Sequence, residues 1–120
     1  MTDDVTVSCA RCGGEAAKFS LLPPRPADKS AQHGLQRTGF IGEVTKFGAA
    51  DELRRLLEMI RSDCAAAQGA DADFVAFHCR ACHRNYCQRC WRMGPPEFDD
   101  GFYDFTKATC PEGHEQIVDD

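Results

Sequence analysis

Apolar side chains recur at spacings of three and four residues through the middle of the chain. If residues 50–67 are helical, these side chains share one face, which comprises Leu53, Leu56, Leu57, Ile60, Cys64 and Ala67. Asp51 and Glu52 lie at the start, where acids complement the helix dipole, and Gly69 is expected to end the helix. The pattern therefore predicts an amphipathic helix over residues 50–67, with the Cys64 thiol buried in the core.

Shorter apolar runs predict extended segments. Residues 40–47 combine β-branched and aromatic side chains, although Gly42 weakens a strand there. Residues 74–77 are expected to form a short strand, and residues 85–86 a strand or turn. Residues 27–39 are polar, and we expect them to form a mobile connection.

One segment late in the chain, residues 95–105, mixes aromatic side chains with acids. Its aromatic members are Phe98, Phe102, Tyr103 and Phe105. Its acids are Glu97, Asp99, Asp100 and Asp104. Such a segment either lines a small core or forms a contact surface for a partner.

The size of the chain bounds its organisation. With 120 residues, 42% of them hydrophobic, it suits one small domain over residues 1–120, whose apolar core alone would be marginal. Bound metal is the expected supplement. No apolar stretch approaches the roughly 18 residues that span a bilayer. The start lacks a basic segment followed by an apolar run, so we expect a cytoplasmic protein whose cysteines stay reduced.

The cysteines are arranged almost entirely in pairs. Seven of the eight, with one histidine, form four two-ligand knuckles, which in chain order are Cys9 and Cys12, Cys79 and Cys82, Cys87 and Cys90, and Cys110 and His114. A C-x2-C turn aims two thiolates at one metal, and a structural zinc site takes four such ligands. We therefore predict two zinc ions held by these eight residues. His83, beside Cys82, is the alternative to His114.

Three pairings of the four knuckles are open. Sequential pairing joins the first knuckle to the second, interleaved pairing joins the first to the third, and nested pairing joins the first to the fourth. The segment from Cys82 to Cys87 spans at most about 18 Å when extended, so the chain can either cross between two metals or fold back onto one. The long gap before the second knuckle predicts a zinc module made of residues 5–18 and 74–120, with an inserted arm and helix over residues 19–73.

Charge narrows the choice of partners. The formal net charge is −5, and zinc bound to seven thiolates would lower it by about 3 more, which disfavours general affinity for nucleic acid or anionic lipid. Residues 78–93 contain no acid but carry Arg80, Arg84, Arg89 and Arg92. These arginines either compensate the anionic zinc–thiolate centres or meet an anionic partner.

The sequence of residues 77–90, Phe-His-Cys-Arg-Ala-Cys-His-Arg-Asn-Tyr-Cys-Gln-Arg-Cys, resembles the central signature of FYVE zinc fingers. This resemblance implies a two-zinc, treble-clef-like brace with interleaved pairing. FYVE fingers bind phosphatidylinositol 3-phosphate through an upstream Trp-x-x-Asp element and a fuller basic run. Only His78 and Arg80 match that site, so lipid binding is disfavoured.

The same run also resembles the IBR domains of RING-between-RING ligases, whose pairing is sequential, and more distantly RING fingers. RING fingers recruit a ubiquitin-conjugating enzyme through an aliphatic residue in the first knuckle and a tryptophan further on. Ala10 and Trp91 stand nearest to those positions. This resemblance implies, as an alternative, a component of a ubiquitin ligase with Trp91 as a contact residue.

We therefore expect an α+β domain with two structural zinc sites, an inserted amphipathic helix and the role of an adaptor that recognises a protein partner. Catalysis is not expected, because two sites with four protein ligands each leave no position for a reactive water. The chain also lacks H-E-x-x-H and zinc-deaminase motifs. The candidate contact surfaces are the arginine segment and the acidic aromatic segment.

Overall fold

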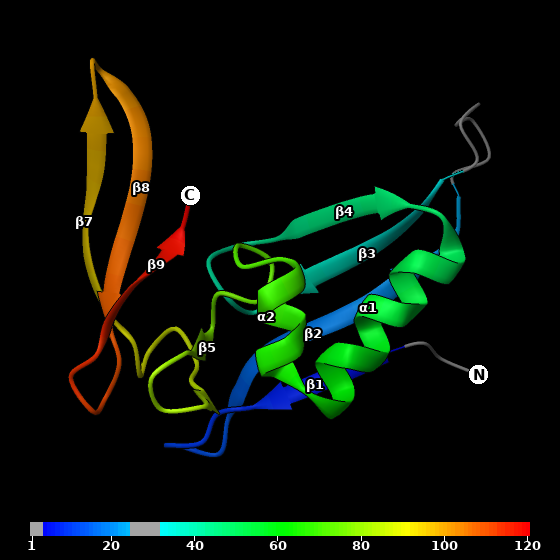
Figure 1. Cartoon of the computed structure of the whole chain (residues 1–120), viewed down its shortest axis with the longest axis horizontal. Coiled ribbons are helices and arrows are strands. Elements are labelled where there is room, and N and C mark those ends of the chain that lie inside the picture. The colour runs from blue at the N-terminus through cyan, green and yellow to red at the C-terminus, as the bar shows by residue number, and fades with distance from the viewer. Residues whose placement is uncertain (1–3, 25–31) are drawn as a thin grey trace.

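The computed structural model describes residues 4–24 and 32–120. It is a small α+β fold built mostly of antiparallel sheets (Figure 1). The elements of the described residues are β1 (Asp4–Ser8), β2 (Glu15–Leu22), β3 (His33–Thr38), β4 (Val44–Gly48), α1 (Ala50–Ser62), α2 (Cys64–Ala70), β5 (His78–Cys79), β6 (Arg84–Asn85), β7 (Arg92–Asp99), β8 (Phe102–Thr109) and β9 (Glu115–Asp119).

The first four strands form one antiparallel sheet in the order β1-β2-β3-β4. Burial alternates along β1, where Val5 and Val7 point into the core, as expected for a sheet with one covered face. Helix α1 covers that face (Figure 1) and buries the leucines and isoleucine of its apolar stripe. The aromatic centre of the core is Phe19, whose ring lies 5.3 Å from Phe74 and 5.8 Å from Phe77.

The predicted helix over residues 50–67 is divided into α1 and α2. Asp63 separates them with a non-helical backbone conformation, and its carboxylate accepts a hydrogen bond of 3.1 Å from the Ala66 amide. A single helix was wrong because this aspartate caps a new helix instead of continuing the old one. Cys64 is half-buried rather than buried, and its thiol donates to the Ile60 carbonyl at 3.1 Å.

Two strand predictions need correction. Residues 74–77 form a buried turn, because Asp71 accepts hydrogen bonds from the amides of Phe74 and Val75 with its carboxylate and its carbonyl. The predicted strand over 40–47 begins later, at Val44, after a turn in which Gly39 and Gly42 have positive φ. Part of the connection predicted over residues 27–39 lies outside the described residues, and its second half forms the regular strand β3.

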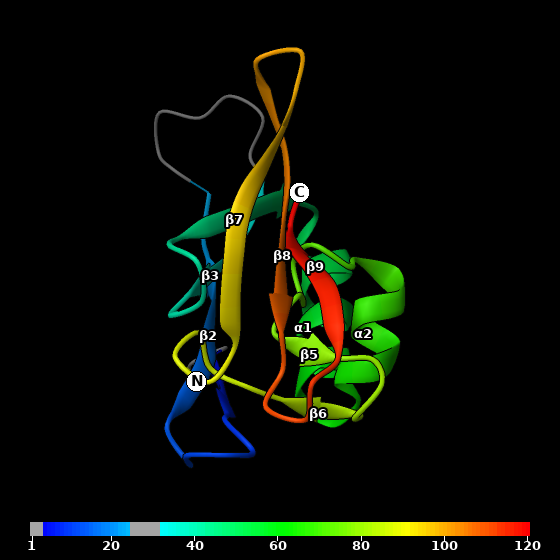
Figure 2. The ribbon, with the colours of Figure 1, turned by 90° about the vertical axis from the view of Figure 1, so that its left-hand side faces the viewer.

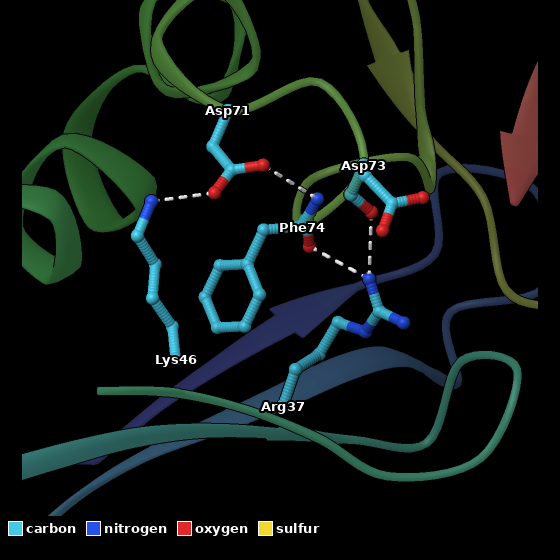
Figure 3. A network of polar contacts seen from close by, with 5 residues as sticks. All are labelled: Arg37, Lys46, Asp71, Asp73 and Phe74. Atoms are coloured by element: carbon cyan, nitrogen blue, oxygen red, sulfur yellow. Dashed lines mark hydrogen bonds and ion pairs between the residues drawn. The ribbon is translucent and has the colours of Figure 1, made fainter. Parts of the chain in front are cut away.

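A buried arginine ties the four-stranded sheet to this turn (Figure 3). Arg37 on β3 is 3% exposed and donates at 2.9 Å to the carbonyls of Asp73 and Phe74. Burial lowers the pKa of its guanidinium, and nearby carboxylates, first that of Asp73, oppose the shift. Lys46 on β4 adds an ion pair to Asp71. The turn is therefore held by side chains from two adjacent strands.

The C-terminal strands form a separate sheet in the order β7-β8-β9. Its β7–β8 hairpin extends away from the rest of the molecule (Figure 2). The hairpin turns at Asp100 and Gly101, both with positive φ, which is the Asp-Gly chemistry of a two-residue hairpin loop. At its base, a Cβ on Gly94 would lie 3.0 Å from the Lys107 carbonyl oxygen, so the close strand approach there favours glycine.

Strand β2 runs through the boundary between the predicted zinc module (5–18) and the predicted inserted arm (19–73), so both contribute to one sheet. No helix among the described residues is long and apolar enough to cross a membrane.

Candidate metal centres

The eight predicted ligands lie in two groups of four. Within each group, the candidate ligand atoms are all within 4.8 Å of one another. Site 1 comprises Cys9, Cys12, Cys87 and Cys90, and site 2 comprises Cys79, Cys82, Cys110 and His114. The first knuckle therefore meets the third and the second meets the fourth, which is the interleaved arrangement.

The distances within the two groups fit a tetrahedral ion. Zinc–sulfur bonds of about 2.3 Å place two sulfurs about 3.8 Å apart at the tetrahedral angle. The Sγ atoms of Cys12 and Cys87 are 3.6 Å apart in site 1, and those of Cys82 and Cys110 are 3.7 Å apart in site 2. His114 Nδ1 lies 3.2 Å from Cys82 Sγ, as befits the shorter bond of an imidazole nitrogen. Each group can hold one metal ion, and its donor set suits zinc.

The first knuckle is shaped by hydrogen bonds within its own loop. The Cys9 amide donates to the Gly14 carbonyl at 2.7 Å, and the Gly13 amide returns a bond of 3.0 Å to the Cys9 carbonyl. Gly13 has a φ of 75°, a conformation that glycine adopts without steric cost. The Gly14 amide then points at Cys12 Sγ, 3.4 Å away, which stabilises a thiolate there.

The fourth knuckle is also a hydrogen-bonded turn, although three residues separate its two ligands instead of two. The amide of Cys110 donates to the His114 carbonyl at 2.8 Å, and the Gly113 amide donates to the Cys110 carbonyl at 2.9 Å. The φ of Gly113 is 92°, which closes the turn between the two ligands. This turn brings His114 Nδ1 to 3.4 Å from Cys110 Sγ. The turn of the Cys-Pro-x-Gly-His segment thus presents the imidazole to site 2.

Each site contains at least one cysteine with a lowered thiol pKa and one with a raised thiol pKa. Burial raises the pKa of Cys9, but backbone amides, first that of Cys12, outweigh it and lower the pKa to about 6. In site 2, burial likewise opposes the amides of His114 and Glu112, which lower the pKa of Cys110 to about 7. Burial raises the pKa of Cys79 to about 11 and, together with the other site 1 thiols, raises that of Cys90 to about 12. Each site therefore holds at least one cysteine whose pKa is lowered to near neutral pH, while a metal must displace the proton from another.

The short β5–β6 hairpin connects the two sites. Cys79 on β5 belongs to site 2, whereas Cys87, just after β6, belongs to site 1. The Asn85 carbonyl accepts a hydrogen bond of 2.7 Å from the Ala10 amide inside the first knuckle. Asn85 Oδ1 also lies 2.8 Å from Nδ1 of the buried His78. The hairpin thus fixes the position of each site relative to the other.

The arginine segment does not form one surface. All four arginines are exposed, but Arg89 and Arg92 line one hollow and Arg80 lines another. The first hollow also contains Arg11, which sequence reasoning missed although it stands inside the first knuckle. Arg84 lies on β6 and lines neither hollow.

Trp91, expected as a contact residue, lies in the core. It is 2% exposed, its indole nitrogen donates to the Phe77 carbonyl at 3.1 Å, and its ring packs edge-on against Tyr86. A tryptophan whose polar atom is satisfied inside the fold is unable to offer its ring to a partner.

The acidic aromatic segment is the most exposed apolar surface of the described chain. Phe98 and Phe102 are 63% and 78% exposed, and Tyr103 is 42% exposed. The prediction that this segment lines a small core is therefore wrong for these three residues. Phe105 is half-buried, with the Lys107 ammonium 5.7 Å from its ring centroid. The Asp-Gly pair at residues 100–101 is the sequence signal that could have identified this segment as a hairpin.

Comparison with known proteins gives one finding. The profile of a protein family, described as Domain of unknown function (DUF8328), matches residues 1–120. No curated protein and no solved structure matches the chain.

Proposed function

The chain belongs to the family described as Domain of unknown function (DUF8328), and we propose that it is a structural zinc module that presents its β7–β8 hairpin to a protein partner. The observation that carries this proposal is the exposure of Phe98 and Phe102 on a hairpin built directly beside two four-ligand centres. Strand β7 begins just after Cys90 of site 1, and β8 ends just before Cys110 of site 2. The metals would therefore hold the base of the hairpin.

Zinc is the metal that we propose for both sites. Four thiolates, or three thiolates and one imidazole, are the donor sets of structural zinc centres. Thiolate ligands persist in a reducing compartment, which supports a cytoplasmic location. Four protein ligands complete the tetrahedral shell and leave no position for a reactive water, so we propose a structural role and not an enzymatic one.

The hairpin has the composition of a recognition element. Aromatic side chains contribute the largest share of binding energy in many interfaces, because they bury a large area at little entropic cost. Phe98 and Tyr103 pack edge-on at 6.1 Å, which keeps both rings ordered before any partner binds. The Tyr103 hydroxyl is also held, 2.6 Å from a carboxylate oxygen of Asp119.

Acids surround these aromatic rings, so the partner that we propose has an apolar cleft with a basic rim. The hairpin acids are Glu97, Asp99, Asp100 and Asp104, all exposed. Complementary charge at the rim would accelerate association and select against acidic partners. A component of a ubiquitin ligase is less well supported, because the buried Trp91 would not be available to a conjugating enzyme.

Affinity capture with a matched pair of variants tests the proposal. The zinc-loaded protein is compared with a variant carrying Phe98→Ser and Phe102→Ser, and co-purifying proteins are quantified by mass spectrometry. We expect at least one protein to be retained by the native chain and lost from the variant. Phe47→Ser is the control, because Phe47 is 56% exposed but lies on β4 of the other sheet.

Zinc content and circular dichroism establish that both variants remain folded. Retention of every captured protein by the hairpin variant would refute the proposed surface. Loss of the same proteins from the Phe47→Ser control would show that exposed aromatic rings bind them without regard to position.

A further inference from the structure

A hollow of about 360 Å³ lies between the two metal centres, at the base of the β7–β8 hairpin. Cys90 of site 1 and Cys110 of site 2 both contribute to its wall. The remaining wall includes Thr109 and three arginines from three different segments, which are Arg11 in the first knuckle, Arg89 in the third, and Arg92 at the start of β7.

The three guanidinium groups are exposed and unpaired. None has a carboxylate within 4.0 Å among the described residues, and none donates to a cysteine sulfur there. Other cations of the chain do have acidic partners, as Lys107 has in Glu115 at 3.7 Å. Glu112 stands in the turn next to Pro111, but it does not line the hollow. Three arginines thus contribute to the wall of a hollow that no acid of the described chain lines.

We infer that this hollow is an oxyanion site that takes the phosphate group of a small soluble molecule. The inference is independent of the proposed role of the hairpin, because no aromatic residue of the hairpin lines the hollow. A phosphate monoester carries close to two negative charges and three strong acceptor oxygens at neutral pH, and guanidinium groups match such oxygens in pairs. Three cations from three directions suit that ligand better than a carboxylate, which has two oxygens and one charge.

The two metal centres give the hollow its rigidity. Arg11 and Arg89 lie between the ligands of their C-x2-C knuckles, and Arg92 follows Cys90 by two residues, so the site 1 metal would fix their backbone. The Thr109 backbone pairs with that of Arg92 in the β7–β8 register, and both residues line the hollow. A fixed arrangement of donors reduces the entropic cost of binding a small anion.

A competing role for these arginines is compensation of the metal centres. A divalent ion with four thiolates carries a charge of about −2, and one with three thiolates and a histidine about −1, so three arginines would balance both. Compensation requires only proximity to the thiolates, whereas an anion site requires unpaired donors facing solvent. The two roles differ in measurable ways, because compensation alone predicts no saturable response to phosphate.

Titration of the zinc-loaded protein with inorganic phosphate tests the inference. We expect saturable binding by calorimetry at millimolar phosphate, with heteronuclear NMR shifts centred on Arg11, Arg89, Arg92 and Thr109. Replacing any one of the three arginines by glutamine is expected to weaken binding about fivefold to tenfold, since each removes charge-assisted hydrogen bonds. Arg55→Gln is the matched control, because Arg55 is exposed on α1 and does not line the hollow.

Further experiments test which anions bind and whether the phosphate group belongs to a soluble molecule or to a lipid. Sulfate should compete with phosphate, acetate should compete poorly, and added sodium chloride should weaken binding. Vesicles of phosphatidylcholine with phosphatidic acid should not bind more tightly than free phosphate. Binding to the vesicles alone would overturn the inference of a soluble ligand.

Two results would overturn the site itself. The first is a phosphate response that is absent or does not saturate. The second is a response that the arginine variants and Arg55→Gln weaken equally. Zinc content of each variant shows that the metal sites are intact, and the Phe98→Ser and Phe102→Ser variant should bind phosphate as the native chain does.

Discussion

The interleaved grouping of ligands can be tested by combining substitutions in pairs. Cys12 and Cys87 belong to site 1, and Cys82 belongs to site 2. Removing Cys12 and Cys87 together should therefore release one zinc ion per chain and leave the other bound. Removing Cys12 and Cys82 together, or Cys82 and Cys87 together, should release both ions.

The size of the effect follows from the closed four-ligand geometry. Structural zinc binds with an apparent free energy of about 10–16 kcal/mol, which is about 2.5–4 kcal/mol for each of four ligands. One cysteine replaced by alanine should weaken its site by roughly a hundredfold to a thousandfold. A second alanine in the same site has no further effect on zinc content, because that site has already lost its ion.

The assay is zinc per chain after dialysis against a chelator whose affinity lies between those of the native and single-variant sites. Single alanine variants at Cys12, Cys82 and Cys87 should each retain one ion. Cys64→Ala is the control and should retain both, since Cys64 is the one cysteine outside the two sites. Circular dichroism reports whether the remaining site still supports folded structure.

Each alternative pairing predicts that a different double variant retains one zinc ion. Retention of one ion after combined loss of Cys12 and Cys82 would indicate sequential pairing. Retention after combined loss of Cys82 and Cys87 would indicate nested pairing. Either result would refute the grouping of ligands described above.

Three further outcomes are expected. Arg37→Met should lower the free energy of unfolding by about 2–4 kcal/mol in urea denaturation, because the carbonyls of Asp73 and Phe74 lose a charged donor, and relief of the cost of burying the guanidinium offsets only part of that loss. Phe102→Ser should change stability by less than about 0.5 kcal/mol by the same measurement, since the ring is 78% exposed. Acidification should release zinc, because protons compete for the thiolates. The lowered pKa values of Cys9, about 6, and Cys110, about 7, mean that these two ligands hold fewer protons at neutral pH than ordinary thiols, so they oppose zinc binding less than Cys79 and Cys90, and zinc content across a pH series should fall as the pH is lowered.

Sequence predicted the metal ligands far better than it predicted how they pair. A knuckle is a local turn, so its spacing is visible in the chain, and the Gly13 and Gly113 conformations are local as well. Pairing depends on where β5 and β6 lead the chain, and the distance from Cys82 to Cys87 permits every arrangement. The interleaved expectation came from the resemblance to FYVE fingers, and the structure has the same grouping.

Two of the errors in secondary structure share a physical cause. The apolar run at residues 74–77 looks like a strand because its side chains are buried, but Asp71 and Arg37 hold its backbone as a turn. Arg37 stands within a polar stretch of the sequence, and nothing in that stretch predicted that its side chain would be buried. Asp63 starts the new helix α2 through a side-chain hydrogen bond from the Ala66 amide that helical periodicity does not record. In both cases a polar side chain overrode the pattern of apolar positions.

The interleaving also gives metal loading a direction along the growing chain. Site 1 needs residues from Cys9 to Cys90, so it is complete once the four-stranded sheet and both helices have been made. Site 2 needs His114, so it waits until β7 and β8 have been added. During synthesis, a metal could therefore close site 1 while Cys79 and Cys82 still lack the other two ligands of site 2. For that interval Cys79 and Cys82 would form an open two-thiolate knuckle, and a metal in site 2 would make the base of the hairpin rigid only in the last step of assembly.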